Sequence, residues 1–238
     1  MLSAFFPDEC RLCESPLIEA SRIPVCAFCW DSIEPDTQFI QCLTCGRGFD
    51  SAAPLIGGRC GQCSMDAPAF DRAESYALYS GGVRKLVHLL KYDGIEPLAK
   101  SLALRLWRSL DRHIEADALI PAPMFWARRW SRRFNQKDLL ARRLAELSGI
   151  RYGGGILQRT RSTPSQAGLS RTDRKKNLRG SFRVRKPDRV AGQRIALVDD
   201  IMTMGTTLSE CARALKAAGA QSVLALTVAR AELEGGRT

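Results

Sequence analysis

Apolar residues recur at helical spacing in four stretches of the chain after its first third. The apolar positions between Val83 and Leu90 follow the i, i+3, i+4, i+7 rule, which predicts an amphipathic helix over residues 82–91. Pro97 fits the first turn of a second helix, and Asn135 is a good cap for a third. We expect the remaining helices at residues 98–110, 135–148 and 207–218.

Short apolar runs without helical spacing lie between these helices and predict buried strands. They cover residues 118–120, 194–198 and 222–228. Strand, helix and strand follow one another over residues 194–228, which predicts a right-handed crossover between parallel strands. The expected fold class is therefore α/β, with a mostly parallel central sheet flanked by helices.

Charge divides the chain into two unlike parts. Residues 1–68 hold four basic and nine acidic residues, whereas the rest holds 32 and 16, so the whole chain has a net charge of +11. The pattern changes near Ala67-Pro68, which predicts a small domain over residues 1–67 and a larger one over residues 68–238. The basic excess is strongest over residues 126–190. It fits either a solvated surface or a site for polyphosphate or nucleic acid.

Composition excludes several classes of protein. Apolar residues make up 45% and charged residues 26% of the chain, which is not the composition of a disordered protein. No apolar run approaches the ~20 residues that a membrane-spanning helix needs, so we expect no membrane insertion. The first residues lack a basic segment followed by an apolar one, so we expect a cytoplasmic location.

Eight of the nine cysteines form four Cys-x-x-Cys pairs in the first domain. Two such pairs supply four thiolates, the shell that a structural Zn²⁺ prefers, so the pattern predicts two structural zinc sites. Iron–sulfur ligation and a redox dithiol are the alternatives. The simplest grouping is sequential, and an interleaved grouping is the other choice. The expected ligands are Cys10, Cys13, Cys26 and Cys29 for one site and Cys42, Cys45, Cys60 and Cys63 for the other.

The segment over residues 195–207 combines two adjacent acids with a turn rich in Thr and Gly. An apolar strand leads into Asp199 and Asp200, and the turn then leads into a helix whose first N–H groups can bind a phosphate. Gly205 lets the backbone approach the ligand closely. The Walker pattern is absent. Acids that precede a phosphate turn can reach the hydroxyls of a ribose 5-phosphate, although a helix-capping role for the acids is the structural alternative.

Val198-Asp-Asp-Ile-Met-Thr-Met-Gly-Thr-Thr207 resembles the 5-phosphoribosyl-1-diphosphate (PRPP) signature of type I phosphoribosyltransferases. The wider chain, with its double zinc ribbon, resembles the ComF family of these proteins, which is linked to competence and DNA uptake. The further matching stretches begin at Leu90 (LKYDG), Ile120 (IPAP), Arg133 (RFNQ), Thr163 (TPSQAGL), Asn177 (NLRGSF) and Glu210 (ECARALKAAGA). The chain departs from the family pattern at Phe125, Arg133 and Met204.

The resemblance implies a role for each matching position. The acid pair should hold the ribose hydroxyls and orient Mg²⁺, and the segment over residues 159–180 should form a loop that closes over PRPP. The implied PRPP-binding residues are Asp199, Asp200, Thr203, Met204, Gly205, Thr206, Thr207, Pro123, Met124, Arg159 and Gln166. The implied catalytic residues are Asp199, Asp200, Arg171, Arg174 and Lys176.

Two functions of different class follow from the resemblance. The first is a Mg²⁺-dependent phosphoribosyltransferase that transfers 5-phosphoribosyl from PRPP to an unidentified acceptor, releases pyrophosphate and is linked to DNA uptake. The second is a non-catalytic competence protein that binds nucleic acid on the same fold, with PRPP or a nucleotide as regulator. Trp126, Trp130 and Phe134 alternate with arginines and fit either contacts to single-stranded DNA or core packing. The expected partners are PRPP, its acceptor, and single-stranded DNA or DNA-uptake proteins.

Overall fold

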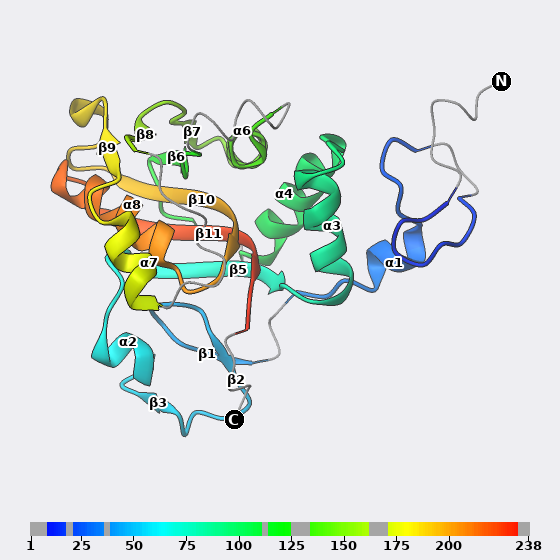
Figure 1. Cartoon of the computed structure of the whole chain (residues 1–238), viewed down its shortest axis with the longest axis horizontal. Coiled ribbons are helices and arrows are strands. Elements are labelled where there is room, and N and C mark those ends of the chain that lie inside the picture. Colours follow the sequence, from blue (N-terminus) through cyan, green and yellow to red (C-terminus); the bar gives the residue numbers. More distant parts are fainter. Residues whose placement is uncertain are drawn as a thin grey trace.

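The structure, a computed structural model, describes residues 9–17, 21–35, 39–110, 114–124, 134–161 and 171–232. In this part of the chain a central sheet carries helices on both faces (Figure 1). Two small cysteine-containing segments lie at different places around this body, one beside α3 and one below β5 in the view of Figure 1.

The central sheet has five strands in the order β5-β11-β10-β6-β7. All of its neighbouring strands are parallel. The strands are β5 (Arg72–Leu78), β6 (Ala118–Pro121), β7 (Arg151–Tyr152), β10 (Arg194–Met202) and β11 (Ser222–Arg230). The α/β class and the parallel pairing of the strands on either side of the last predicted helix are therefore confirmed.

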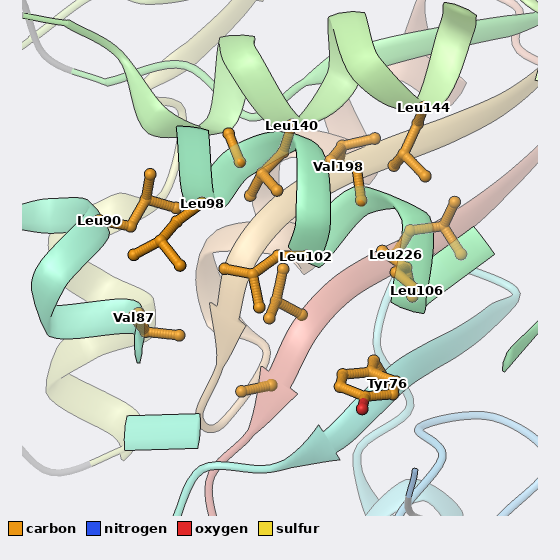
Figure 2. Packing of buried hydrophobic residues seen from close by; sticks show 14 of the residues in the cluster. Tyr76, Val87, Leu90, Leu98, Leu102, Leu106, Leu140, Leu144, Val198 and Leu226 are labelled. Atoms are coloured by element: carbon orange, nitrogen blue, oxygen red, sulfur yellow. The ribbon is translucent and has the colours of Figure 1, made fainter. Parts of the chain in front are cut away.

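Among the described residues, three helices cover one face of the sheet: α3 (Gly81–Lys91), α4 (Pro97–Ser109) and α6 (Gln136–Ser148). Their apolar stripes meet the even-numbered residues Ala196 and Val198 of β10 in one buried cluster. Figure 2 shows how leucines of α4 and α6 interlock over β10 and β11 in this cluster. Asn135 caps α6 through a bond from the Lys137 N–H, at 3.2 Å, as expected.

The opposite face is covered by α8 (Thr206–Ala217), α7 (Arg171–Leu178) and the antiparallel pair β8 (Leu157–Arg159) and β9 (Phe182–Val184). The odd-numbered Ile195 and Leu197 point to this side, because successive side chains of a strand face opposite ways. Cys211 of α8 is fully buried here, in agreement with its expected place in the core. A short 3-10 turn, η1 (Pro187–Arg189), leads into β10.

The cysteine-rich region is built from very short elements. The segment around the first four cysteines contains α1 (Ala27–Asp31), and the segment around the next four contains five elements. These are β1 (Ile40–Gln41), β2 (Gly48–Phe49), β3 (Leu55–Ile56), β4 (Arg59–Cys60) and α2 (Gly61–Met65). With so little regular structure, neither segment has a core of its own that would suffice without metal.

Hydrogen bonds attach the first cysteine segment to the body. Arg105 of α4 donates to the carbonyls of Trp30, at 2.8 Å, and Ile33, at 3.2 Å, and its guanidinium lies over the Trp30 ring. Lys85 of α3 donates to the Leu12 carbonyl at 2.8 Å. The domain boundary expected between residues 67 and 68 stays a prediction.

The structure differs from the expectations in three places. Strand β10 continues through both acids to Met202, whereas the apolar run predicted an end at Val198. Helix α7 occupies residues for which only a loop was expected. Strands β5, β7, β8 and β9 were not predicted, because they are short or carry polar residues such as Arg72, Glu74 and Gln158 inside them.

Candidate functional site

The order of the strands marks one edge of the sheet as a place for a ligand. After β6 the chain passes through α6 to β7, outward on one side, whereas after β10 it passes through α8 to β11 on the other. The connections therefore diverge between β6 and β10, and open α/β sheets bind ligands at such a switch point, outside the carboxyl ends of the strands. Asp199 and Asp200 lie on β10 at this point.

The two acids are held almost completely inside the protein. Asp199 is 3% and Asp200 4% exposed. The Asp200 N–H donates to Asp199 Oδ1 at 2.7 Å, and the Ile201 N–H donates to Asp200 Oδ1 at 2.8 Å. Backbone donors thus fix one oxygen of each carboxylate, and the second oxygen of each is directed to other partners.

Three side chains from two helices meet the acid pair. Lys137 of α6 lies 2.8 Å from Asp199 Oδ1 and 3.0 Å from Oδ2. Lys91, the last residue of α3, lies 3.1 Å from Asp200 Oδ2, and Gln136 Nε2 donates to the same oxygen at 2.8 Å. The helices on the first face of the sheet therefore deliver two cations and an amide to the pair.

Sequence reasoning assigned no role to Lys91, Gln136 or Lys137. A signal was present, since Lys91 lies in the family stretch that begins at Leu90 and Gln136 ends the one that begins at Arg133. The structure shows that these stretches meet at the acid pair, although 64 residues separate Gln136 from Asp200 in the chain.

Burial and the two lysines give the acids different pKa values. Burial raises the pKa of Asp199 to about 6, against the opposing attraction of Lys137. Burial also disfavours the charge on Asp200, but Lys91 and Lys137 outweigh it and hold the pKa of Asp200 well below its usual range. Burial likewise disfavours the charge on Lys137, yet both acids together raise the pKa of this ammonium.

The turn over residues 203–207, here called the phosphate turn, follows the acid pair directly. Gly205 has φ +70°, a left-handed conformation that favours glycine, and it is the N-cap of α8. Because glycine has no side chain to cap the helix, the first N–H groups of α8 are left for another acceptor. Thr206 is buried, whereas Thr203 and Thr207 are more exposed, and the structure brings these expected phosphate-binding residues together beside the acids.

Pro123, Met124 and Arg159, expected on the pyrophosphate side, lie together at a separate cavity of about 220 Å³. Asn135 and Arg185 also line it. The cavity thus lies between the end of β6, the start of α6 and strand β8. Asp138 lines the cavity as well, but it is paired with Arg142, so the two arginines leave the wall suited to an anionic group.

The other expected site residues are less well placed by the structure. Helix α7 contains Arg171, Arg174 and Lys176 and packs on α8, and Lys176 is exposed. Gln166 lies outside the described residues, as do Phe125 and Arg133. Their expected roles stay predictions.

The eight paired cysteines form two groups. The first cysteine group is Cys10, Cys13, Cys26 and Cys29, and the second cysteine group is Cys42, Cys45, Cys60 and Cys63. Within each group the four sulfur atoms lie within 4.8 Å of one another. The sequential grouping is thereby confirmed over the interleaved one.

The sulfur positions fit tetrahedral zinc. A tetrahedron with Zn–S bonds of about 2.3 Å has sulfur atoms about 3.8 Å apart. Cys13 and Cys26 have their sulfurs 3.7 Å apart, and Cys45 and Cys60 have theirs 3.8 Å apart. Four sulfur ligands leave no open position, so both groups suit structural metal. They differ in burial, because the second group is fully buried whereas Cys13 is exposed.

Helices long and apolar enough to cross a membrane are absent from the described part of the chain.

Two family models match the chain, one in each part. The double zinc ribbon domain matches residues 1–64, and the phosphoribosyl transferase domain matches residues 137–235. The second match covers α6, the acid pair and the phosphate turn. The fold expected from the resemblance is therefore confirmed for both parts of the chain.

Relatives match over nearly the whole length. DNA utilization protein YhgH of Salmonella typhimurium is 33% identical, over 91% of this chain and 94% of its own. The protein of the same name from Escherichia coli K12 is 31% identical, over the same shares of the two chains. Competence protein F of Haemophilus influenzae is 29% identical, over 95% of this chain and 99% of its own.

Solved structures match over about half of the chain. Glutamine PRPP amidotransferase from B. subtilis is 24% identical over 56% of this chain and 26% of its own, with a TM-score of 0.40. Adenine phosphoribosyltransferase from Saccharomyces cerevisiae is 14% identical over 58% and 69%, with a TM-score of 0.36. These matches are partial, and the fold assignment rests on the parallel sheet and the matched domains. With a double zinc ribbon ahead of a phosphoribosyl transferase domain, and with relatives that align from end to end, the chain belongs to the ComF family, that of DNA utilization protein YhgH and Competence protein F.

Proposed function

We propose that the protein binds PRPP together with Mg²⁺ and transfers its 5-phosphoribosyl group to an acceptor, with release of pyrophosphate. The observation that carries this proposal is the acid pair of β10, buried at the switch point and followed directly by the phosphate turn. A ribose 5-phosphate spans these two features, because its hydroxyls and its phosphate lie at opposite ends of the sugar.

The hydrogen bonds of the acid pair leave room for the ribose. A carboxylate oxygen can accept two hydrogen bonds. Asp199 Oδ2 is bonded to Lys137 and Asp200 Oδ1 to the Ile201 N–H, so each has capacity for one further donor. We assign these two oxygens to the two ribose hydroxyls, which donate to them.

Lys91 and Lys137 determine whether Mg²⁺ would bind to the acid pair by itself or together with the ligand. Carboxylate oxygens suit Mg²⁺, but Lys91 and Lys137 already balance the two negative charges of the pair. The ion would therefore arrive with the negative charge of the diphosphate rather than bind to the free pair. When bound, it would supply positive charge to the leaving pyrophosphate.

The chain's own groups would act mainly by position and charge. In the reaction the bond from ribose C1 to the pyrophosphate oxygen breaks, and a bond from C1 to the acceptor forms. Negative charge grows on the leaving group, and groups placed in advance stabilise it. Arg159 and Arg185 line the cavity at the end of β6, the strand that pairs with β10 just before the acids, so we assign the pyrophosphate to this cavity. The basic residues of α7, Arg171, Arg174 and Lys176, are proposed to assist there.

The test is pyrophosphate release from PRPP with Mg²⁺ and a panel of acceptors: nucleobases, amines, ammonia and alcohols. The wild type should release pyrophosphate with one class of acceptor. The double variant Asp199→Asn, Asp200→Asn should bind PRPP at least about tenfold more weakly, because each charge-assisted hydrogen bond contributes roughly 1.5–3 kcal/mol. Glu115→Gln, at a side chain that is 84% exposed, is the control and should bind as the wild type does. Equal PRPP affinity in the double variant and the wild type, measured by calorimetry, would overturn the ribose assignment.

A second candidate function is nucleic-acid binding in DNA uptake, without turnover of PRPP. The names of the relatives, DNA utilization protein and Competence protein F, favour it. The arginine-rich stretch expected to contact DNA, residues 126–133, lies outside the described residues. A salt-sensitive mobility shift of single-stranded DNA, with no pyrophosphate release for any acceptor, would favour this function over transfer. We propose that the protein performs either function in the cytoplasm, the location expected from its sequence.

A further inference from the structure

We propose that Arg230 couples the second cysteine group to the phosphate turn, so that zinc in this group and a ribose 5-phosphate at the turn strengthen each other's binding. The ligand half of this proposal rests on the proposed function, whereas the zinc half does not. It makes Arg230 a positioning residue that joins the two domains of the chain.

Arg230 is the last residue of β11, and its side chain extends into the second cysteine group. It is only 5% exposed. Its Nη1 donates to the carbonyl of Cys45, and its Nη2 donates to Cys45 Sγ at 3.4 Å. The guanidinium therefore bonds both the backbone and the metal-binding atom of one cysteine. Hydrogen bonds to ligand atoms of this kind orient the ligands of a metal and tune its binding.

Arg230 also lies against Met202, the residue directly before the phosphate turn. Arg230 is the register partner of Met202, the last residue of β10, and Nη1 lies 3.9 Å from Met202 Sδ. The Ala231 N–H donates to the Met202 carbonyl at 2.9 Å. Met202 Sδ would in turn lie 3.5 Å from a Cβ atom placed on Gly205, so Met202 packs against the phosphate turn. One buried arginine and one buried methionine thus connect the metal group to the turn.

The cysteine group also touches the sheet directly. Gly46, beside Cys45, has φ +69°, and a Cβ at this position would lie 2.6 Å from the Ala73 carbonyl of β5. The backbone of this group is therefore packed against the strand next to β11 with no space for a side chain. A shift of the metal group has to be passed on to the strands.

The charges at the second cysteine group indicate that zinc and the ligand strengthen each other's binding. Four thiolates around Zn²⁺ carry a net charge of −2, and the four cysteines of this group are all buried. Arg230 supplies buried positive charge to this group. Without metal the four sulfur atoms are no longer held around one point, so the buried guanidinium loses the carbonyl and the sulfur of Cys45 as fixed acceptors. The arginine then has to move, and the Met202 support of the turn moves with it.

The first cysteine group offers an internal comparison. Lys85 of α3 and Arg105 of α4 donate hydrogen bonds to the backbone around this group, and both helices lie on the other face of the sheet from α8. Zinc at the first group is therefore expected to be insensitive to a ligand at the phosphate turn.

Zinc release and ligand affinity in Arg230 variants test the proposal. Arg230→Met removes the charge and the hydrogen bonds while keeping an apolar stem, and Arg230→Lys keeps the charge alone. The control is Arg213→Met, because the side chain of Arg213 is 59% exposed on α8, where it pairs with the buried Glu210 and contacts neither cysteine group. Zinc-loaded proteins are mixed with a chelating dye, and ribose 5-phosphate affinity is measured by calorimetry. The fold of each variant is checked by circular dichroism.

In Arg230→Met, one of the two zinc ions should leave several times faster than in the wild type, and ribose 5-phosphate should bind about tenfold more weakly, a usual size for coupled sites. Arg230→Lys should lie between the two, and Arg213→Met should match the wild type. Because coupling is reciprocal, saturating ribose 5-phosphate should slow the release of that same zinc ion in the wild type and leave the other unchanged.

Faster zinc release with unchanged ribose 5-phosphate affinity would overturn the coupling, as would weaker affinity with unchanged release. If Arg230→Met does not fold, Arg230→Lys and the ligand effect on zinc release in the wild type decide the question. A wild type that binds neither PRPP nor ribose 5-phosphate would overturn the proposed function and the coupling together. A wild type that binds ribose 5-phosphate without slowing zinc release would overturn the coupling alone.

Discussion

Asp199 and Asp200 are neighbours in one strand, yet the protein shifts their pKa values in opposite directions. Asp200 receives two lysine charges and an amide donor, whereas Asp199 pairs with one lysine and is more affected by burial. At neutral pH both carboxylates are therefore ionised, but Asp199 gains a proton first as the pH falls. For the proposed PRPP site, Asp199 therefore predicts a pH dependence of binding near neutrality.

We expect PRPP affinity to decline as the pH falls through about 6, the pKa of Asp199. The sign follows from the charge, because a protonated carboxyl is a weaker acceptor for a ribose hydroxyl than a carboxylate is. The measurement is calorimetry between pH 5 and 8 on the wild type and on Asp199→Asn. The phosphate groups of PRPP titrate equally in both experiments, so the ratio of the two affinities isolates Asp199.

This ratio should be large at pH 8 and approach one near pH 5, since a protonated Asp199 resembles the asparagine. A ratio that stays constant across the range would show that Asp199 does not act as a charged acceptor for the ligand. Glu115→Gln should follow the wild type at every pH.

The acids and the turn were predictable because they are adjacent in sequence, whereas their partners were not. Asp199, Asp200 and Gly205 lie within one strand-turn-helix segment, and local chemistry is enough to assign them. Lys91 and Lys137 reach the acids only through the packing of α3 and α6 on the sheet. The family stretch that begins at Leu90 contains Lys91, but no local pattern distinguishes Lys137 from the many other basic residues of the chain.

At the scale of elements, spacing and caps predicted the helices well and the strands less well. Helices α3, α4, α6 and α8 begin and end within about one or two residues of their expected bounds. Strand β10 extends beyond Val198 because its ladder with β11 continues through the acids, and polar side chains do not interrupt backbone hydrogen bonds. Helix α7 was missed because its residues are mostly charged and show no apolar stripe.

Trypsin tests the segment over residues 159–179, which ends in α7. It contains seven basic residues, and the diphosphate of PRPP with Mg²⁺ supplies the opposite charge, so we expect the ligand to close this segment over the site. Cleavage within the segment should be ready in the free protein and slow with PRPP and Mg²⁺. Digestion followed by mass spectrometry identifies the bonds that are cut.

Two further ligands make the outcome specific. Pyrophosphate with Mg²⁺ should protect in part, and ribose 5-phosphate hardly at all, because the segment is proposed to contact the leaving group. Protection by short single-stranded DNA and not by PRPP would contradict this assignment and favour a nucleic-acid surface.

At the scale of the whole molecule, the two segments that contain the cysteine groups attach to different parts of the same body (Figure 1). The first contacts α3 and α4, and the second contacts β5 and β11. Both groups have the geometry of closed four-sulfur sites. Metal bound at these groups would therefore support the body at two places and would not only maintain a small separate domain.

We expect two Zn²⁺ per chain in freshly reduced protein, measured by elemental analysis. Removal of both by a strong chelator should lower the melting temperature of the whole protein, because apo zinc domains of this size are unfolded or nearly so. Fewer than one zinc per chain, or an unchanged melting curve after complete removal, would contradict a structural role for the two groups.

The sheet pairs its first strand in the chain with its last. Within the sheet, β5 (Arg72–Leu78) is bonded to β11 (Ser222–Arg230), and the register joins Leu224 to Arg72. A growing chain therefore exposes the edge of β5 until all residues between Leu78 and Ser222, and then β11 itself, have been synthesised. Contacts between such distant segments form slowly, and an unpaired edge is prone to aggregation in the meantime. The sheet is thus completed late in folding, after β11 has been synthesised. A chain shortened before Ser222 would leave β5 without its partner in the sheet.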